Sequence, residues 1–223
     1  PHVASLTAIG SKLNYTVPVD VKQQVDLMWS NSVTTDLKKQ DNKIQFNFQH
    51  ATSKIGFTME AKIEGTSPID EYEKVKLQIK KIVLTSNPNN AGDGTGIFYK
   101  NATLEMNNLA DVAIWADFGS ERQSYTLTDF VNDEITINKS YTPQPAKSII
   151  DDDSYLMIIP QNFLTGGFDI YVEYDVNLYF NGSGADSDYN YNTYTNGCIA
   201  NLKINFEPAK SYVINIRLGL KDA

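Results

Sequence analysis

The sequence predicts an all-β protein whose antiparallel strands pack as a β-sandwich, with little helix. Apolar and polar residues alternate with a period of two, which is the pattern of a strand with one buried face. The pattern is clearest at 168–180, where Phe168, Ile170 and Val172 share one face while Asp169 and Glu173 lie on the other. Similar segments recur between turn-rich stretches, and helical spacing is scarce. Many strands with few helices between them are typical of a sandwich.

The other predicted strands have the same periodicity. The stretch 44–63 contains two strands joined by a corner, because the apolar parity of Phe46 and Phe48 is opposite to that of Phe57 and Met59. Each strand in such an arrangement turns its apolar side chains toward the same core. Further strands are expected at 13–18, 75–84, 97–106, 134–138, 155–159, 201–206 and 212–220.

Two segments depart from regular alternation. Within 75–84 the apolar positions shift by one residue near Lys80, as an extra residue in a β-bulge would cause. The segment Asn107–Phe118 is the best helical candidate because its apolar residues have rough helical spacing, although Trp115 fits a short strand equally well.

Three polar segments indicate connections between strands. The stretches 86–96 and 181–197 are dense in Gly, Asn, Asp and Ser, so we expect both to project as loops. The polar stretch Thr35–Asn42 predicts a linker. This linker divides the chain into a lead-in, 1–41, and a β-sandwich domain, 42–223.

Composition excludes several classes of function. The formal net charge is -8 over 223 residues, and no Lys/Arg-rich stripe offsets it, so nucleic acid is not an expected partner. No apolar run is long enough to span a bilayer as a helix. The single cysteine, Cys198, rules out an intrachain disulfide, and we expect it to be a packed thiol in or near the core.

The sequence contains no constellation typical of catalysis, a metal site or a cofactor site. His2 and His50 are far apart, and His50 is expected to be half-buried with a hydrogen-bond partner. Gly92, Gly94 and Gly96 lack phosphate-loop spacing and indicate a turn. The acidic run at 151–153 lacks the spaced ligands of a calcium loop and is expected to be a solvated turn. We therefore predict that the chain is not an enzyme and binds no cofactor.

The tyrosines of the second polar loop are the most suggestive binding residues. Tyr189, Tyr191 and Tyr194 are separated by small polar residues, and such tyrosines stack on sugar rings or anchor protein interfaces. The alternative is a turn packed against its own domain. The three tyrosines are the candidate ligand or adhesion contacts.

Four elements resemble the fimbrillin-like proteins of Bacteroidales pili, in the family's order along the chain. They are DLMWSNS at 26–32, FNFQHATSKIGFTMEA at 46–61, SYLMIIPQNF at 154–163 and NFEPAKSYVINIRLGL at 205–220. Phe206 stands where the family often has Trp, and Ala209 stands where it often has Gly. Neither departure breaks the alternation of the last element.

The resemblance implies transthyretin-like sandwiches, export to the outer membrane as a lipoprotein precursor, and a place in a cell-surface fimbria. It also implies assembly with copies of the chain or sister pilins through a donated strand, with 1–41 as the end of an N-terminal β-domain. Adhesion to surface glycans or proteins is a further expectation, and the alternative function is a carbohydrate-binding surface module. The residues expected in the core or at seams between elements are Trp29, Phe46, Phe48, Phe57, Ile158 and Tyr212.

Overall fold

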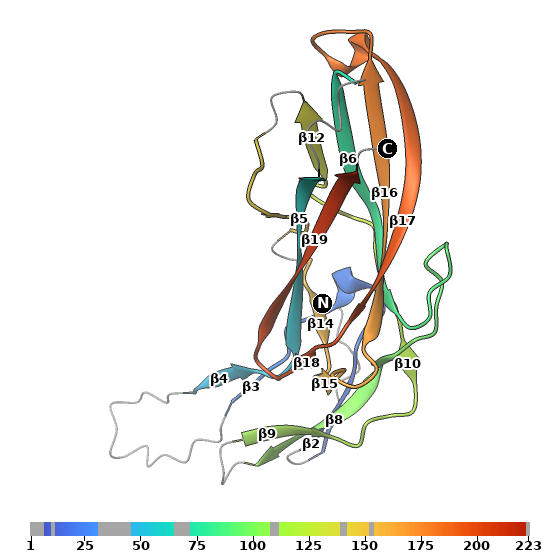
Figure 1. Ribbon diagram of the computed structural model, residues 1–223. Coiled ribbons are helices and arrows are strands. Elements are labelled where there is room, and N and C mark those ends of the chain that lie inside the picture. Colours follow the sequence, from blue (N-terminus) through green and yellow to red (C-terminus); the bar gives the residue numbers. More distant parts are fainter. Residues whose placement is uncertain are drawn as a thin grey trace, which may run out of the picture.

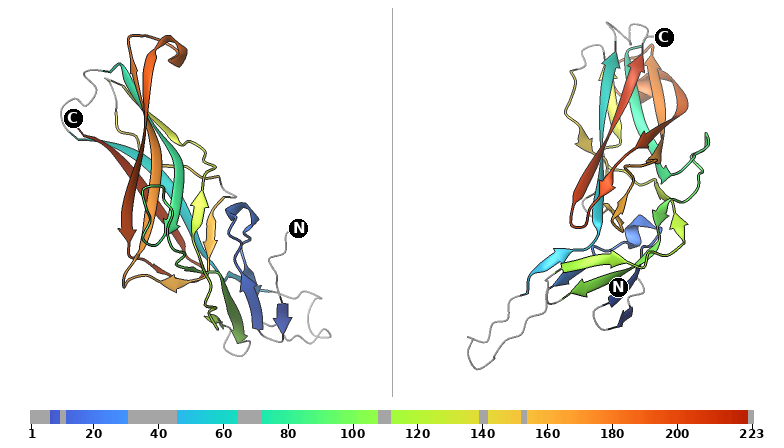
Figure 2. Two further views of the ribbon diagram at one scale, coloured as in Figure 1. Left: turned by 90° about the vertical axis from the view of Figure 1, so that its right-hand side faces the viewer. Right: turned by 60° about the horizontal axis from the view of Figure 1, so that its bottom comes forward.

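The protein is an elongated, nearly all-β molecule (Figures 1 and 2). The computed structural model describes residues 7–9, 12–30, 46–64, 72–107, 112–138, 142–151 and 154–221. A large sandwich of two sheets forms one end, and a smaller sheet forms the other. The predicted all-β class is confirmed. Helix is limited, in the described residues, to two short 3-10 turns, η1 (Val21–Gln23) and η2 (Asp186–Asp188).

One layer of the sandwich is a five-stranded antiparallel sheet, the wide sheet. Its central strand β16 spans Phe168–Phe180, the range that the alternation predicts. Phe168, Ile170 and Val172 belong to the hydrophobic core, and Asp169 and Glu173 lie on the other face, as expected. The other strands of this sheet are β6 (Lys74–Thr85), β11 (Tyr125–Leu127), β12 (Glu134–Asn138) and β17 (Asn190–Leu202).

The predicted bulge in β6 is confirmed. Glu173 of β16 pairs with Lys81, whereas the next residue, Tyr174, pairs with Ile79. Lys80 is therefore the extra residue on β6. The bulge lets apolar residues on both sides of Lys80 point into the same core.

The other layer is a four-stranded sheet, the narrow sheet. Its strands are β5 (Ser53–Glu64), β13 (Lys147–Ser148), β14 (Leu156–Ile158) and β19 (Ser211–Lys221). The antiparallel prediction is wrong for one pair, because β19 runs parallel to β5 over eleven residue pairs. Parallel neighbours need a crossover, and the chain between these two strands forms all five strands of the wide sheet.

A second four-stranded sheet, the basal sheet, lies at the opposite end of the molecule (Figure 1). It consists of β1 (Thr7–Ile9), β2 (Lys12–Thr16), β8 (Asn101–Asn107) and β9 (Val112–Ala116). Short two-stranded pairs join the two ends: β3 (Met28–Ser30) with β4 (Phe48–His50), β7 (Phe98–Tyr99) with β10 (Arg122–Gln123), and β15 (Gln161–Asn162) with β18 (Asn205–Phe206).

The helix predicted at Asn107–Phe118 is wrong for the residues that the structure describes, because β9 occupies the middle of that range. Trp115 explains the outcome. Its Nε1 donates a hydrogen bond to the Ala51 carbonyl at 2.7 Å, and its ring packs 6.0 Å from that of Tyr15. A tertiary anchor of this kind outweighs a weak helical pattern.

The expected structural residues divide into buried and exposed ones. Trp29, Phe57 and Ile158 are buried, and Tyr212 is half-buried against the core. Phe46 and Phe48 are 51% and 62% exposed, so the prediction that they are core residues is wrong for the chain on its own. The reason is that, among the described strands, β4 pairs only with β3, and this ribbon extends away from the sandwich (Figure 1).

The predicted linker, Thr35–Asn42, lies outside the described residues, and so does the boundary between residues 41 and 42. The division at this boundary stays a prediction. In the structure, β2 of the predicted lead-in pairs with β8, which belongs to the predicted sandwich domain.

Candidate assembly surface

Two long strands lie at the same side of the sandwich, each with one unpaired edge. β17 pairs only with β16, and β19 pairs only with β5 among the described residues. The opposite edges of both sheets also meet, because residues of β12, β5 and β13 line one cleft. The free edges of β17 and β19 therefore both lie on the side of the sandwich opposite this cleft (Figure 1). An unpaired edge presents backbone donors and acceptors that can bind another strand.

The two sheets differ in width at this side. β11 and β12 share one edge of β6, so the wide sheet is four strands across at any level. β13 and β14 likewise share one edge of β5, so the narrow sheet is three strands across. Among the described strands, none therefore lies opposite β17 of the wide sheet.

No described strand consequently covers the inner face of β17. Residues that pair directly across two strands share a face, and Val172, Tyr174 and Val176 of β16 pair with Cys198, Asn196 and Tyr194. All three β17 residues are exposed, although their partners pack on the core. We call this surface the uncovered strip: Asn192, Tyr194, Asn196 and Cys198 of β17 with the half-buried Tyr174, Val176 and Leu178 of β16.

β17 itself corrects a prediction. The stretch 181–197 was expected to be one loop, but only 181–189 forms the connection, with η2 inside it, and β17 begins at Asn190. β16 and β17 pair at thirteen successive positions. The other predicted loop, 86–96, is confirmed as a connection between β6 and β7, with a bridge between Ser86 and Thr95.

The candidate tyrosines do not form one site. Tyr191 stacks on Tyr179 with ring centroids 5.5 Å apart, and Tyr189 packs edge-on against Tyr179 at 5.9 Å. These three residues form the tyrosine cluster. It lies on the outer face of the wide sheet, because Tyr179 has the same parity in β16 as Asp169 and Glu173, and Tyr191 pairs directly with Tyr179. Tyr194 belongs to the uncovered strip on the inner face.

Charged groups surround the tyrosine cluster. Lys74 Nζ lies 4.4 Å from the centroid of the Tyr189 ring and 4.8 Å from that of Tyr179. Lys74 and Lys76 both donate to the carboxylate of Asp186, and these hydrogen bonds lower the pKa of Asp186. Burial raises the pKa of Tyr179. The cluster therefore presents an uncharged aromatic face beside a paired cation and anion.

Sequence reasoning missed Tyr179 and its lysine neighbours. The period-two pattern places Tyr179 on the polar face of 168–180, which is the available signal. Recognising its contact with Tyr191 also requires the register of the hairpin, and the sequence does not fix that register while 181–197 is interpreted as a loop.

Cys198 is exposed, so its prediction as a core or near-core residue is wrong. Partial burial of the thiol against the sheet nevertheless raises the pKa of Cys198, which lowers the fraction of reactive thiolate. His50 has the expected partner, since its Nδ1 lies 2.7 Å from Asp26 Oδ2, and its side chain is 53% exposed, close to the expected half burial. In the described part of the chain, no group of three or more His, Cys, Asp or Glu residues could hold a metal ion.

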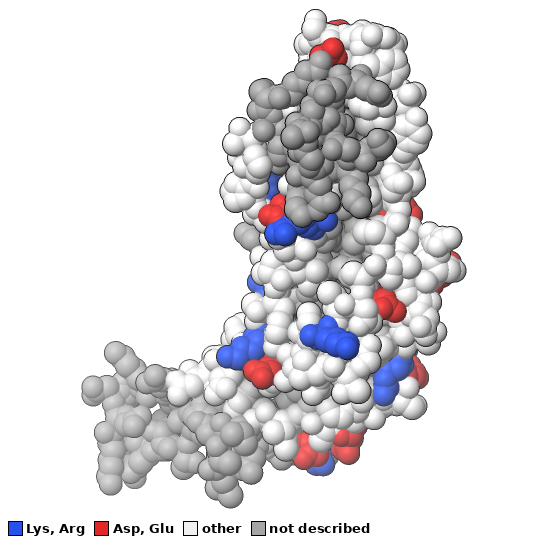
Figure 3. Space-filling model, in the orientation of Figure 1, with Lys and Arg blue, Asp and Glu red and all other residues white. Residues whose placement is uncertain are grey.

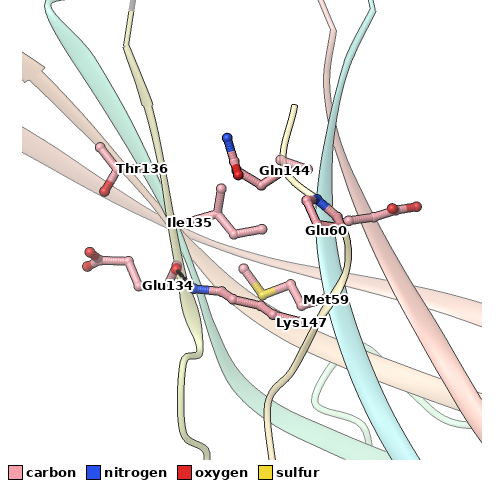
Figure 4. A pocket seen from close by; sticks show the side chains of 9 residues that line it. Met59, Glu60, Glu134, Ile135, Thr136, Gln144 and Lys147 are labelled. Carbon is pink, nitrogen blue, oxygen red and sulfur yellow. Dashed lines mark hydrogen bonds between the residues drawn. The ribbon is translucent and has the colours of Figure 1, made fainter. Parts of the chain in front are cut away.

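A cleft of about 490 Å³ opens between the other edges of the two sheets. Ile135 of β12 and Met59 of β5 point toward one another across it, with Gln144 and Lys147 at its margins, while Thr136 and Glu60 point away (Figure 4). Lys147 donates a 2.9 Å hydrogen bond to the Glu134 carbonyl. The cleft has an apolar floor with one cation at its rim, so it suits an apolar side chain.

Comparison with protein families identifies the chain. The model of the fimbrillin-like family matches residues 2–222. The chain belongs to the fimbrillin-like family. This confirms the resemblance carried by the four sequence elements. No protein with a curated description matches the chain.

Two solved structures are similar to this fimbrillin-like chain. A fimbrial protein from Bacteroides vulgatus ATCC 8482 has a TM-score of 0.58 and 17% identity, over 96% of this chain and 67% of that protein. A protein from Bacteroides uniformis ATCC 8492, whose proposed role is cell adhesion, has a TM-score of 0.44 and 15% identity, over 96% of this chain and 63% of that protein. At 17% identity, the first likeness supports the fold. The fimbrillin-like chain spans about two thirds of each protein's length.

The family elements occupy two parts of the fimbrillin-like chain. The last element contains β18 and β19, and the third contains β14 and β15, so both contribute to the sandwich and its seam. The first two contain β3, β4 and most of β5.

None of the helices in the described residues is long and apolar enough to cross a membrane.

Proposed function

We propose that this chain is a structural subunit of a bacterial surface fimbria and that it assembles by accepting a strand from a neighbouring subunit at β19. Membership of the fimbrillin-like family supports the fimbrial role. The observation that carries strand acceptance is the difference in width between the two sheets. A strand added to the free edge of β19 would lie opposite β17 and cover the uncovered strip.

The physical gain from such a strand has two parts. Its backbone would pair with unpaired amides and carbonyls of β19. Its apolar side chains would also remove the half-buried Val176 and Leu178 from water, at about 25 cal/mol for each Å² of apolar surface buried. Backbone pairing gives affinity, and alternate side chains in contact with the strip give specificity.

A pair of adjacent substitutions tests strand acceptance. Cys198→Asp places a charge on the uncovered strip, whereas Ile199→Asp places the same charge on the outer face of the same strand. Both sites are exposed, so both variants are expected to fold. We expect wild-type subunits from the cell surface to give a heat-sensitive ladder in SDS without boiling. Cys198→Asp should abolish this ladder, and Ile199→Asp should retain it.

Electron microscopy of the same surface material supplies the second readout. Wild-type cells and the Ile199→Asp variant should carry fibres, and the Cys198→Asp variant should carry none. Equal ladders and equal fibres for the two variants would show that the uncovered strip is not the acceptor surface. A single unboiled monomer band from wild-type cells, without fibres, would contradict assembly altogether.

Adhesion through the tyrosine cluster is a second candidate role, and it includes the alternative of a carbohydrate-binding module. The supporting observation is that Tyr191 is 60% exposed and lies flat against Tyr179, beside the ion pair of Asp186 and Lys74. A supported aromatic ring with adjacent hydrogen-bonding groups suits a sugar ring. Tyr191→Ala should remove binding on a glycan array, and Tyr194→Ala should keep it. An array on which wild-type protein binds nothing would contradict this role.

The family membership also supports a place in a cell-surface appendage, and our proposal includes export to the outer membrane as a lipoprotein precursor. Partners are then copies of this chain or sister pilins.

We further propose that 1–41 is the end of an N-terminal β-domain and that 42–223 forms the sandwich domain. Limited proteolysis that cuts first between residues 35 and 42 would support this division, and a chain resistant there would contradict it.

A further inference from the structure

The free edge of β17 lacks the features that normally stop an edge strand from pairing. Proteins protect exposed edges with charged side chains, prolines, bulges or very short strands. β17 has 13 residues and contains neither a charged residue nor a proline. It pairs with β16 at thirteen successive positions without a shift in register. Every residue from Asn190 to Asn201 is exposed. The strand is therefore long, regular and unprotected.

The other long edge of the sandwich differs in charge. β19 contains Arg217, which forms an ion pair with Glu60 on the outer face of the narrow sheet. The upper right margin of Figure 3, where β17 lies in Figure 1, carries few charged side chains. With a formal net charge of -8, two copies of this chain repel over much of their surface. The edge of β17 is a place where they can approach without opposing like charges.

The sequence of β17 is also suited to pairing with itself. Asn192–Thr193–Tyr194–Thr195–Asn196 reads the same in both directions. In an antiparallel pair centred on Tyr194, this tyrosine faces Tyr194 of the second copy, Thr193 faces Thr195, and Asn192 faces Asn196. Aromatic pairs and Thr–Thr pairs directly across two strands stabilise a sheet.

The same register places Tyr191 opposite Gly197 of the second copy. A Cβ at Gly197 would lie 2.7 Å from the hydroxyl of Tyr171 in its own chain, so the absence of a side chain at Gly197 lets the ring of Tyr171 lie over β17 on this face. Loop 86–96 packs on Tyr171 and flanks the later half of β17, which pairs with that part of β16. The earlier half, which contains Tyr194, has no described segment beside it in Figures 1 and 2.

We propose that the free edge of β17 pairs with the same edge of a second copy of this chain, antiparallel, about a two-fold axis at Tyr194. The two wide sheets then join into one continuous sheet across the contact. This is a lateral contact that uses a different edge from that of β19. It therefore goes beyond the proposed function and does not depend on strand donation.

Sedimentation velocity of the purified chain tests this contact. Wild-type protein should show a concentration-dependent monomer–dimer equilibrium. Tyr194→Lys and Tyr194→Glu each place like charges opposite each other at the axis, and each should weaken dimerisation by at least about tenfold. Val213→Lys, at a 64% exposed site on β19, should dimerise like wild type. Circular dichroism and thermal unfolding check that each variant is folded.

An equimolar mixture of Tyr194→Lys and Tyr194→Glu gives the sharpest readout. Opposite charges then meet at the axis, so the mixture should recover a heterodimer that neither variant forms alone. Loss of folding or of an unrelated contact would not be rescued in this way. A wild-type chain that stays monomeric at all concentrations, or variants whose mixture stays monomeric, would overturn the pairing.

Thiol trapping tests the register. With Cys198 replaced by Ser, Tyr194→Cys should form a covalent dimer on mild oxidation, because the two cysteines face each other. In the wild-type dimer the two Cys198 residues lie on opposite sides of the axis, eight residues apart along the paired strands, which is about 27 Å. Efficient oxidation of wild-type protein through Cys198 would overturn the register centred on Tyr194.

Discussion

Gly92 packs directly against the ring of Tyr171. A Cβ at position 92 would lie 2.5 Å from Cδ1 of that ring, and Gly92 has φ of +82°. The hydroxyl of Tyr171 also donates a 2.9 Å hydrogen bond to the Asn90 carbonyl. Tyr171 therefore helps to fix loop 86–96 on the outer face of the wide sheet, together with hydrogen bonds from Lys81 to the Ala91 carbonyl and from the Asn87 amide to Asp169. Tyr171 is buried there although it has the parity of the polar face.

Gly92→Ala should destabilise the fold by about 1–3 kcal/mol, because an alanine there has an unfavourable positive φ and a steric clash with Tyr171. Gly166→Ala is the matched control. Gly166 has a similar φ of +86°, but a Cβ there would meet nothing within 4 Å. Urea unfolding of both variants separates the two effects. Equal losses of stability would show that the contact with Tyr171 contributes nothing.

Phe48 of β4 and Phe57 of β5 should respond differently to truncation. Phe57 is buried, so Phe57→Ala should cost about 3–5 kcal/mol of unfolding free energy. Phe48→Ala should cost less than about 1 kcal/mol, because the side chain is 62% exposed. Thermal unfolding of the two variants checks this, and a large loss for Phe48→Ala would mean that the ribbon of β3 and β4 packs on the body in solution.

Phe46 and Phe48 show why alternation predicts a strand better than it predicts a core. The pattern identifies one apolar face of β4, but whether another layer covers that face is a property of the tertiary structure. β16 and the bulge at Lys80 of β6 were predictable because each of these strands has a core on one face and polar residues on the other. A shift in the alternation therefore shows in the sequence.

β17 could not be predicted as a strand for a related reason. The narrow sheet leaves the inner face of β17 uncovered, so this face can carry Asn192 and Asn196 and shows no apolar alternation. Turn-forming residue types therefore suggested a loop. Once β17 is a strand, the period of two places Tyr191 and Tyr194 on opposite faces, and the expected single group of tyrosines separates.

Tyr15 should make the protein sensitive to alkali. Burial, with a smaller contribution from Asp26, raises the pKa of Tyr15 to about 12 from 10.0. The unfolded chain releases this proton near pH 10, and the native state holds it until about pH 12, so the native state binds more protons in this window. Stability is therefore fully present below about pH 10 and falls by about 2–3 kcal/mol as pH rises to about 12.

Tyr15→Phe provides the test of this pH dependence. The Tyr15 hydroxyl is buried and has no hydrogen-bond partner in the described structure, so the variant should be at least as stable as wild type at pH 7. Between pH 10 and 12 it should lose less stability than wild type, as measured by urea unfolding at each pH. Tyr191→Phe, at an exposed site, should follow the wild-type curve. Parallel curves for wild type and Tyr15→Phe would contradict the assignment.

Deletion of Lys80 should be tolerated, because Lys80 is the extra residue of the bulge. Without it, Lys81 opposite Glu173 and Ile79 opposite Tyr174 become consecutive pairs, and every apolar residue of β6 keeps its face. We expect a change of less than about 1 kcal/mol in unfolding free energy.

Deletion of Gln78 is the matched control, and it should be severe. If the bulge is kept, the residues before Gln78 move to the opposite face of the sheet. If the bulge is lost instead, those residues keep their face, but Lys80 turns into the core and Ile79 turns out of it. Either outcome removes buried apolar surface, and burying the ammonium group of Lys80 costs more. We expect a loss of at least about 3 kcal/mol, measured by thermal and urea unfolding. If both deletions were equally destabilising, the register of β6 against β16 would depend on the bulge itself rather than on which side chains it turns inward.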